Sequence, residues 1–190
     1  EANPVRLNLA QVELGAQYAL IINSNAGLWG YNIGDTVKFV SIDPYRIIVT
    51  GRVKHFISAF GEHVIGEEVE AAMLQVANEM NASIVEFTVA PYIAQGEGKS
   101  YHEWLVEFER PPLDMELFKL KLDQAMCAKN VYYQDLITGN ILSPLVLTVL
   151  PKNAFIQYMK SEGKLGGQNK VPRLSNDRKI ADAMHAQLGK

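Results

Sequence analysis

Apolar residues alternate with polar ones in several short stretches of the chain, and this period of two predicts β-strands. Asp43-Pro44 separates two of these stretches and predicts a turn, because proline fixes φ and aspartate bonds its own backbone. Glu13-Leu14-Gly15 joins the first two into a predicted hairpin. The predicted strands are Val5–Leu9, Ala16–Ile22, Thr36–Ile42, Tyr45–Thr50, His55–Ser58, Ser83–Ala90, Tyr101–Phe108, Val131–Asp135 and Leu145–Leu150.

Other stretches repeat their apolar residues every three to four positions, which predicts helices with one apolar face. Val69, Met73 and Val76 show this spacing, after two glutamates that favour a helix N-terminus. Asp114 is an expected N-terminal cap. The predicted helices are Gly66–Asn81, Asp114–Ala128, Asn153–Ser161 and a last one that Asn176 or Asp177 caps and that ends near Leu188.

The order of these elements predicts an α+β fold. We expect a split β-α-β arrangement with a mixed or antiparallel sheet and flanking helices. The two hairpins before it, within residues 4–50, are expected to pair as a small sheet or a partial barrel.

Composition narrows the class of protein. Of 190 residues, 48% are hydrophobic and 21% charged, which is typical of a soluble globular domain. The formal net charge of −3 and the scattered basic residues argue against a nucleic acid or an anionic membrane as partner. Cys127 lies in a helical pattern and is expected to be a plain buried thiol. With no apolar run of about 18 residues and no signal-peptide pattern, we expect a cytoplasmic protein.

Asp35 and Arg52 lie at the outer ends of the predicted 36–50 hairpin, so they should be close in space. A carboxylate and a guanidinium next to glycines can hold a sugar diol or a phosphate. The residue types alone also fit a turn carboxylate that caps backbone N–H groups and an ordinary surface arginine.

The histidines of the sequence do not indicate a metal site. None of the four has metal-ligand spacing. His63, beside Glu62, fits either a general base or, as we prefer, a histidine at a strand edge.

Three motifs resemble those of adenylate-forming enzymes, and in particular the auxin-responsive acyl-acid amido synthetases. Tyr31-Asn32-Ile33-Gly34-Asp35 is similar to the family's Tyr-Arg-x-Gly-Asp motif, and Gly51-Arg52-Val53-Lys54 to its hinge motif. The tail Gly166-Gly167-Gln168-Asn169-Lys170-Val171-Pro172-Arg173 is similar to a third motif, although plant members read closer to Asn-Gln-Tyr/Phe-Lys-Thr-Pro-Arg. The resemblance covers nearly the whole chain but only the C-terminal third of such an enzyme.

The resemblance implies a role for each matching residue. Asp35 would hold the ribose hydroxyls of ATP, with Arg52 and Tyr31 beside it in the nucleotide site. Lys54 would be the hinge about which a mobile C-terminal lid rotates. Lys170 would bridge the substrate carboxylate and the α-phosphate, and Arg173 would either support it or pair on the surface.

The resemblance also implies a division of the chain and a reaction. Residues 1–52 would end a large N-terminal domain that is otherwise missing, and residues 53–190 would form the lid, inactive alone. The parent would use ATP and Mg²⁺, with the metal ligands outside this chain, to activate a small carboxylic acid and join it to an amino acid. Coenzyme A as the acceptor and a non-catalytic binding module stay open as alternatives, as does a homodimer formed through exposed apolar surface.

Overall fold

The computed structural model describes residues 4–52, 56–95, 98–166 and 169–189. The chain forms two compact units, Glu1–Lys54 (unit 1) and His55–Lys190 (unit 2). Unit 1 is a β-sheet, and unit 2 combines a mixed sheet with helices, so the predicted α+β class is confirmed. The predicted boundary at residues 52 and 53 adjoins residues 53–55, which are outside the described residues.

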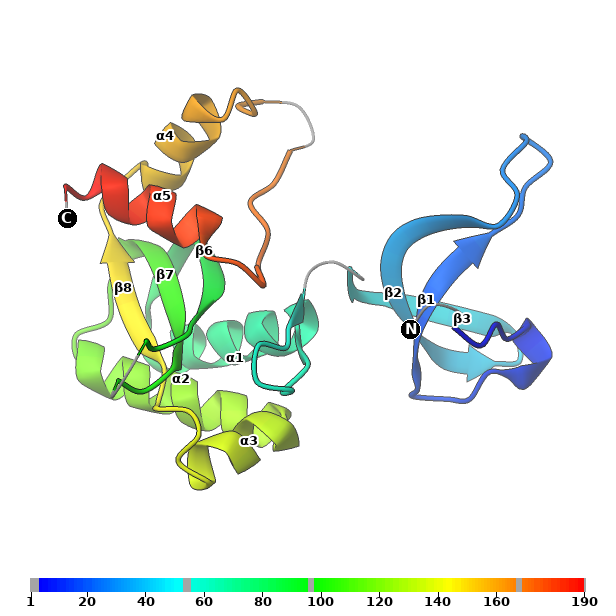
Figure 1. Ribbon diagram of the computed structural model, residues 1–190, viewed down its shortest axis with the longest axis horizontal. Helices are drawn as coiled ribbons and strands as arrows, with labels where there is room; N and C mark the ends of the chain where they lie inside the picture. Colours follow the sequence, from blue (N-terminus) through cyan, green and yellow to red (C-terminus); the bar gives the residue numbers. More distant parts are fainter. Residues whose placement is uncertain (1–3, 53–55, 96–97, 167–168, 190) are drawn as a thin grey trace. The chain divides into compact units, whose positions relative to one another are not determined.

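Unit 1 contains three antiparallel strands, β1 (Gln17–Ile22), β2 (Tyr31–Ile42) and β3 (Tyr45–Arg52), in the order β1-β2-β3 (Figure 1). The pairing of the 16–22 segment with the 36–50 hairpin is therefore confirmed as a small sheet. Among the described residues this sheet does not close into a barrel.

The predicted strand Val5–Leu9 is wrong, because its end forms a 3-10 turn, η1 (Leu9–Gln11). The Asn8 side chain accepts a hydrogen bond from the Ala10 N–H, and the Gln11 side chain accepts one from the Asn8 N–H, both at 3.0 Å. This reciprocal cap turns the backbone away from a strand. The hairpin that Val5–Leu9 was expected to form with Ala16–Ile22 is absent from the described residues.

Unit 2 is built on three strands, β6 (Ser83–Tyr92), β7 (Tyr101–Arg110) and β8 (Val146–Leu150). The middle strand β7 pairs antiparallel with β6 and parallel with β8. Two short strands, β4 (Phe56–Ile57) and β5 (Val64–Ile65), form a separate antiparallel pair before the first helix.

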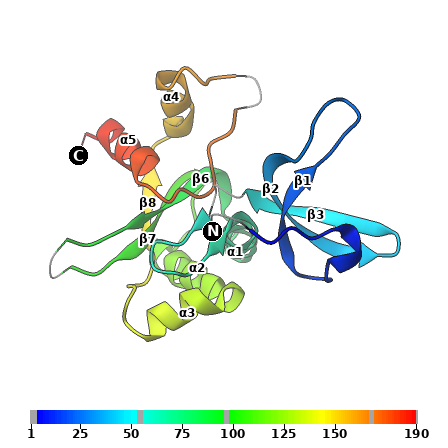
Figure 2. The same cartoon turned by 45° about the vertical axis from the view of Figure 1, so that its right-hand side comes forward.

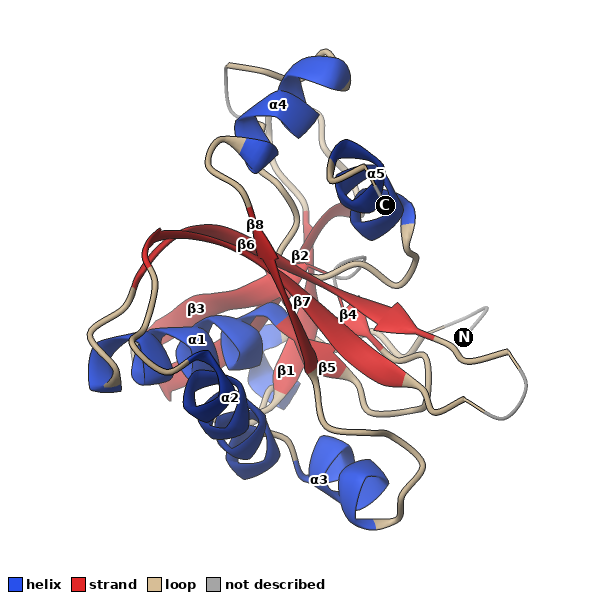
Figure 3. Cartoon of the chain, turned by 90° about the vertical axis from the view of Figure 1, so that its left-hand side faces the viewer, coloured by secondary structure: helices blue, strands red, loops and turns tan. Residues whose placement is uncertain are grey.

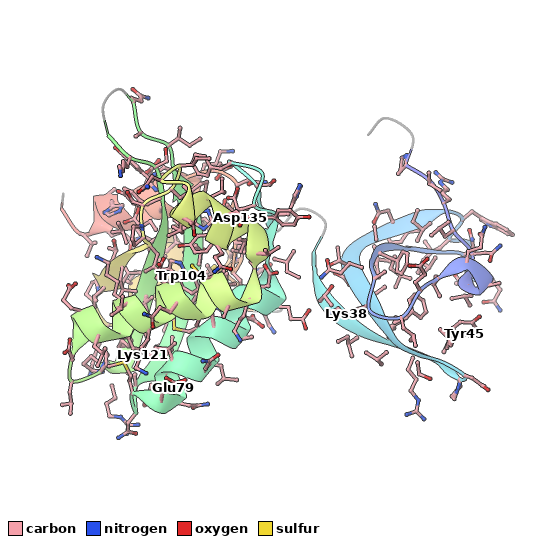
Figure 4. All side chains as sticks on the ribbon, turned by 90° about the horizontal axis from the view of Figure 1, so that it is seen from below. Lys38, Tyr45, Glu79, Trp104, Lys121 and Asp135 are labelled. Atoms are coloured by element: carbon pink, nitrogen blue, oxygen red, sulfur yellow. The ribbon has the colours of Figure 1, made fainter. Side chains whose placement is uncertain are left out.

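Helices cover both faces of this sheet, as Figures 2 and 3 show. Alternate side chains of β7 enter two different cores: Trp104 and Val106 pack with α1 and α2, whereas Leu105 packs with α4 and α5. Trp104, labelled in Figure 4, packs against α1 and α2. At the surface of these two helices, Glu79 of α1 and Lys121 of α2 form an ion pair of 2.9 Å. The helices are α1 (Gly66–Glu79), α2 (Met115–Lys129), α3 (Val131–Thr138), α4 (Ala154–Ser161) and α5 (Lys179–Gln187).

The predicted strand Val131–Asp135 is wrong, since these residues begin helix α3. Asn130 caps the helix, and its side-chain oxygen accepts a hydrogen bond from the Tyr133 N–H at 2.8 Å. Tyr133 is buried, and its hydroxyl donates to Asp123 at 2.7 Å. A cap and a buried tertiary contact thus override the strand preference of valine and tyrosine.

Of the other two predicted helix caps, the one at Asp114 is confirmed and the one of α5 is not. Asp114 accepts a hydrogen bond from the Leu117 N–H at 2.9 Å, as predicted. Asp177 accepts from the Lys179 N–H at the start of α5, whereas the Asn176 side chain accepts from the Ser58 N–H. The N-cap of α5 is Arg178, whose side chain makes no cap hydrogen bond, so neither predicted residue occupies the cap position, and Asp177 bonds the helix from the residue before it.

Cys127 is half-buried beside the first core, and burial raises the pKa of its thiol, with Asp123 adding to the effect. It therefore stays a neutral thiol, in line with the expected structural role. Within the described residues, each helix is too short or too polar to cross a lipid bilayer.

Candidate functional site

The Gly34-Asp35 motif of unit 1 lies in a bulge of β2. Between the pairs Ala19–Thr36 and Ile21–Asn32, the single residue Leu20 of β1 faces three residues of β2, 33–35. Gly34 adopts a φ of +81°, which favours glycine, and its N–H donates to the Asn32 side chain at 2.8 Å. The positive φ explains why a glycine precedes Asp35. The bulge also changes the direction of the side chains next to it, which include Asp35.

Asp35 and Arg52 are directly opposed on neighbouring strands, as the hairpin predicted. Asp35 is half-buried. Tyr31 begins β2 opposite Ile22 and exposes half of its surface. The side chain of Arg52 and the whole of Lys54, the predicted hinge, lie outside the described residues.

In unit 2, the segment after Lys170 runs beside β6 as a short additional strand. Leu174 forms a parallel bridge with Val89. The Val89 N–H donates to the Arg173 carbonyl at 2.9 Å, and the Ser175 N–H donates to the Val89 carbonyl at 3.0 Å. The segment, coloured orange in Figure 1, thereby adds to the edge of the sheet.

Arg173 anchors this segment through its side chain. Its guanidinium donates to Glu70 at 2.9 Å and to the Phe87 carbonyl at 3.2 Å, and it also pairs with Glu86. The same group lies 4.6 Å from the centre of the Phe87 ring, a cation–π distance. Arg173 therefore pairs within unit 2, and Glu70 of α1 is one of its partners.

Lys170 precedes this anchored segment and is exposed. None of the hydrogen bonds and ion pairs among the described residues involves its side chain. Lys170 borders a cavity of about 250 Å³ between α4, the strands β6 and β7 and the residues 164–166 and 169–171. Phe155, Ile156 and Met159 form its apolar wall, and Lys164 is a second cation beside it.

Two of the buried carboxylates of unit 2, Glu62 and Glu103, accept hydrogen bonds from histidines. Glu62 accepts from His102 at 2.8 Å, and Glu103 accepts from Thr148, Arg178 and His185 at 2.6–2.7 Å. Burial raises the pKa of each carboxyl, but the hydrogen bonds outweigh it, so both pKa values lie below the usual glutamate range.

His63, which follows Glu62 in the sequence, is exposed and has a φ of +46°. The histidine that engages Glu62 is instead His102, 40 residues away in the sequence. Because both members of this pair are fully buried, it stabilises the fold rather than meeting a substrate.

Two family models match the chain in sequence order: the GH3 family central domain over residues 1–52 and the GH3 family C-terminal domain over residues 67–179. The second covers more than half of the chain. The chain belongs to the GH3 family. The resemblance to the acyl-acid amido synthetases is thereby confirmed.

GH3 relatives from two plants align over almost the whole chain. The indole-3-acetic acid-amido synthetase GH3.3 of Arabidopsis thaliana is 26% identical over 194 residues, which are 96% of this chain and 32% of the relative. The probable indole-3-acetic acid-amido synthetase GH3.2 of Oryza sativa subsp. japonica is 26% identical over 210 residues, or 99% of this chain and 33% of the relative. The chain thus spans about a third of the length of the relatives it matches.

The solved structure of the GH3.15 acyl acid amido synthetase has the same fold, with a TM-score of 0.72 at 18% identity. The match covers 95% of this chain and 35% of that one. A second structure of that enzyme, in complex with 2,4-DB, matches with a TM-score of 0.70 at 18% identity, over 96% of this chain and 34% of that one.

Proposed function

We propose that the chain is the C-terminal part of an ATP-dependent ligase that activates a carboxylic acid as an acyl-adenylate and transfers the acyl group to the amine of an amino acid. The carboxylate would attack the α-phosphate of ATP and release pyrophosphate. The amine would then attack the acyl carbon, which forms the amide and releases AMP.

The observation that carries this proposal is the match to the GH3 central and C-terminal domains in sequence order. The relatives that align over almost the whole chain are named as amido synthetases. The chain also has the three motifs that resemble those of adenylate-forming enzymes, in the order in which they follow one another in that family.

Lys170 is our candidate for the residue that assists adenylation. Attack of a carboxylate on a phosphate brings two anions together, and a positioned cation lowers the cost of that approach. The exposed Lys170 ammonium, which has no partner among the described residues, is available for this role.

In unit 1, Asp35 would accept hydrogen bonds from the two ribose hydroxyls, since a carboxylate can accept from both. Arg52 and Tyr31 would complete the nucleotide contacts of this unit, and Lys54 would act as the hinge. The antiparallel pairing of Asp35 with Arg52 supports the joint role of these two residues.

Mg²⁺ would accompany ATP in this reaction, as the family resemblance implies. The described residues contain no group of three or more His, Cys, Asp or Glu side chains that could bind a metal ion. The roles proposed above for Asp35, Arg52, Tyr31 and Lys170 therefore include no metal ligand, and we expect the Mg²⁺ ligands in the rest of the ligase.

The test is pyrophosphate–ATP exchange in the full-length ligase with Lys170→Ala. We expect the exchange rate to fall by about 100-fold or more, as for loss of one transition-state donor. Lys164→Ala is the matched control, because Lys164 is an exposed cation of the same segment and borders the same cavity. An unchanged exchange rate in Lys170→Ala would show that Lys170 does not assist adenylation.

The acceptor is tested separately by product analysis. Full-length ligase supplied with ATP, a carboxylic acid and both amino acids and coenzyme A should form an amide. A thioester product would keep the adenylation step and replace the proposed acceptor.

A further inference from the structure

The hydroxyl of Thr88 makes a buried contact with the chain immediately after Lys170. Thr88 lies in the middle of β6 and is 1% exposed. Its hydroxyl donates to the Pro172 carbonyl at 2.7 Å, two residues beyond Lys170. A threonine hydroxyl needs such a partner when it is buried, so the contact binds the segment to the strand.

Every residue from 171 to 174 is held in a different way. Val171 is buried in the core formed with α4 and α5, whereas Leu174 is fully buried in the core formed with α1 and α2. Between them, Pro172 bonds Thr88, and Arg173 pairs with acids of α1 and β6. The segment therefore crosses the edge of the sheet and is fixed on both sides.

Local backbone chemistry transmits this anchor to Lys170. Proline has a fixed φ, and the residue before a proline is restricted to extended conformations. Val171 is that residue, and its side chain is buried as well. Only Val171 and Pro172, both constrained, separate Lys170 from the carbonyl oxygen that accepts from Thr88.

We propose that Thr88 is a positioning residue for Lys170, an inference that rests on the proposed function. Its hydrogen bond fixes the main chain from which Lys170 extends, so that the ammonium reaches the reacting phosphate from a defined origin. Precise placement of a reacting group contributes strongly to rate, and a displacement of about 1 Å can cost on the order of 100-fold.

Thr88→Val in the full-length ligase tests this inference, because valine keeps the shape of threonine and removes the hydroxyl. We expect kcat for adenylation to fall about tenfold or more with little change in the KM for ATP. Thr88→Ser, which keeps a hydroxyl at this position, should have the kcat of the parent enzyme. Thr88→Ala serves the same purpose if valine is not accommodated. Thr148→Val is the matched control, because Thr148 lies in the same sheet and its hydroxyl donates to Glu103 instead.

A double mutant separates positioning from general damage. If Thr88 acts through Lys170, adding Thr88→Val to Lys170→Ala should cause no further loss of kcat. A further loss in that background, or an equal loss in Thr148→Val, would overturn the inference. Normal kcat in Thr88→Val together with a large loss in Lys170→Ala would overturn only the role of Thr88. Normal kcat in Lys170→Ala would overturn the proposed role of Lys170 itself.

Hydrogen exchange on the 190-residue chain gives a readout that needs no activity. Thr88→Val should speed amide exchange in the peptide that covers residues 169–175 and leave exchange in α1 and α2 unchanged. Unchanged exchange at 169–175 would show that the hydroxyl does not fix this segment.

Discussion

The two units bury very different amounts of apolar surface. Among the described residues, unit 1 contributes only Val37 and Phe39 to the buried hydrophobic side chains, and unit 2 contributes all the others. Unit 1 instead exposes large apolar side chains along its strands: Ile21, Tyr31, Val40, Ile42, Tyr45, Ile47, Ile48 and Val49.

This difference shows which unit can be stable by its own contacts. Unit 2 has a helix layer on each face of its sheet and two cores. A three-stranded sheet with two buried apolar side chains cannot offset the entropy cost of ordering its backbone. The exposed apolar strands of unit 1 are typical of a surface that another protein segment covers.

The largest effect is expected when the units are separated. Residues 55–190 should unfold in one cooperative urea transition, whereas residues 1–54 should show none. The chain has two tryptophans, one per unit, so Trp104 fluorescence reports on unit 2 and Trp29 fluorescence on unit 1. A cooperative transition of the isolated residues 1–54 would contradict the comparison.

The next largest effect is expected from the core of unit 2. Leu122→Ala removes a fully buried side chain of α2 and should lower the free energy of unfolding by about 2–5 kcal/mol. Leu120→Ala on the same helix, where the leucine is 54% exposed, should change it by less than about 1 kcal/mol. Urea titration followed by Trp104 fluorescence in a Trp29→Phe background measures both. Equal effects would mean that the core does not lie where the structure places it.

A smaller effect is expected from the buried carboxylate Glu103, whose pKa is lowered in the fold. The ionised form therefore stabilises unit 2 above the ordinary glutamate pKa of about 4.3, and this stabilisation is lost as the pH falls below it. Glu103→Gln should lower the free energy of unfolding by about 1–3 kcal/mol at pH 7. In this variant the free energy of unfolding should also fall less steeply as the pH is lowered.

Unfolding midpoints measured between neutral and acidic pH check this expectation. Glu109→Gln is the control, because Glu109 is an exposed carboxylate of the same strand. An equally steep acid transition in Glu103→Gln and the parent chain would exclude Glu103 as the source.

The smallest effect is expected on self-association. If the exposed strands of unit 1 bring copies of the chain together, Val49→Lys should weaken association, because Val49 is 65% exposed on β3. Leu74→Lys, at a residue 64% exposed on α1 in unit 2, should not. Sedimentation velocity at several concentrations measures both, and an equal response of the two variants would remove unit 1 as the contact surface.

Local patterns predicted most of the elements. The start of α1 at Gly66, the cap at Asp114 and the pairing of Asp35 with Arg52 all depend on residues near one another in sequence. The errors at Val5–Leu9 and Val131–Asp135 are also local: Asn8 and Asn130 form side-chain caps that a strand pattern does not reveal.

The surroundings of Lys170 could not be predicted in this way. Thr88 is 84 residues from Pro172, and Glu70 is 103 residues from Arg173. These contacts depend on how β6, α1 and the 171–175 segment pack together. The motif therefore indicated Lys170, but only the fold reveals what holds it.

Titration of the 190-residue chain with ATP by calorimetry tests most directly whether this chain is one part of a larger nucleotide site. We predict no detectable binding, because Asp35, Arg52 and Tyr31 would supply only part of the contacts and the remainder would come from the rest of the ligase. Tight binding of ATP would show that the site is complete within these residues and would contradict the proposed division of the enzyme.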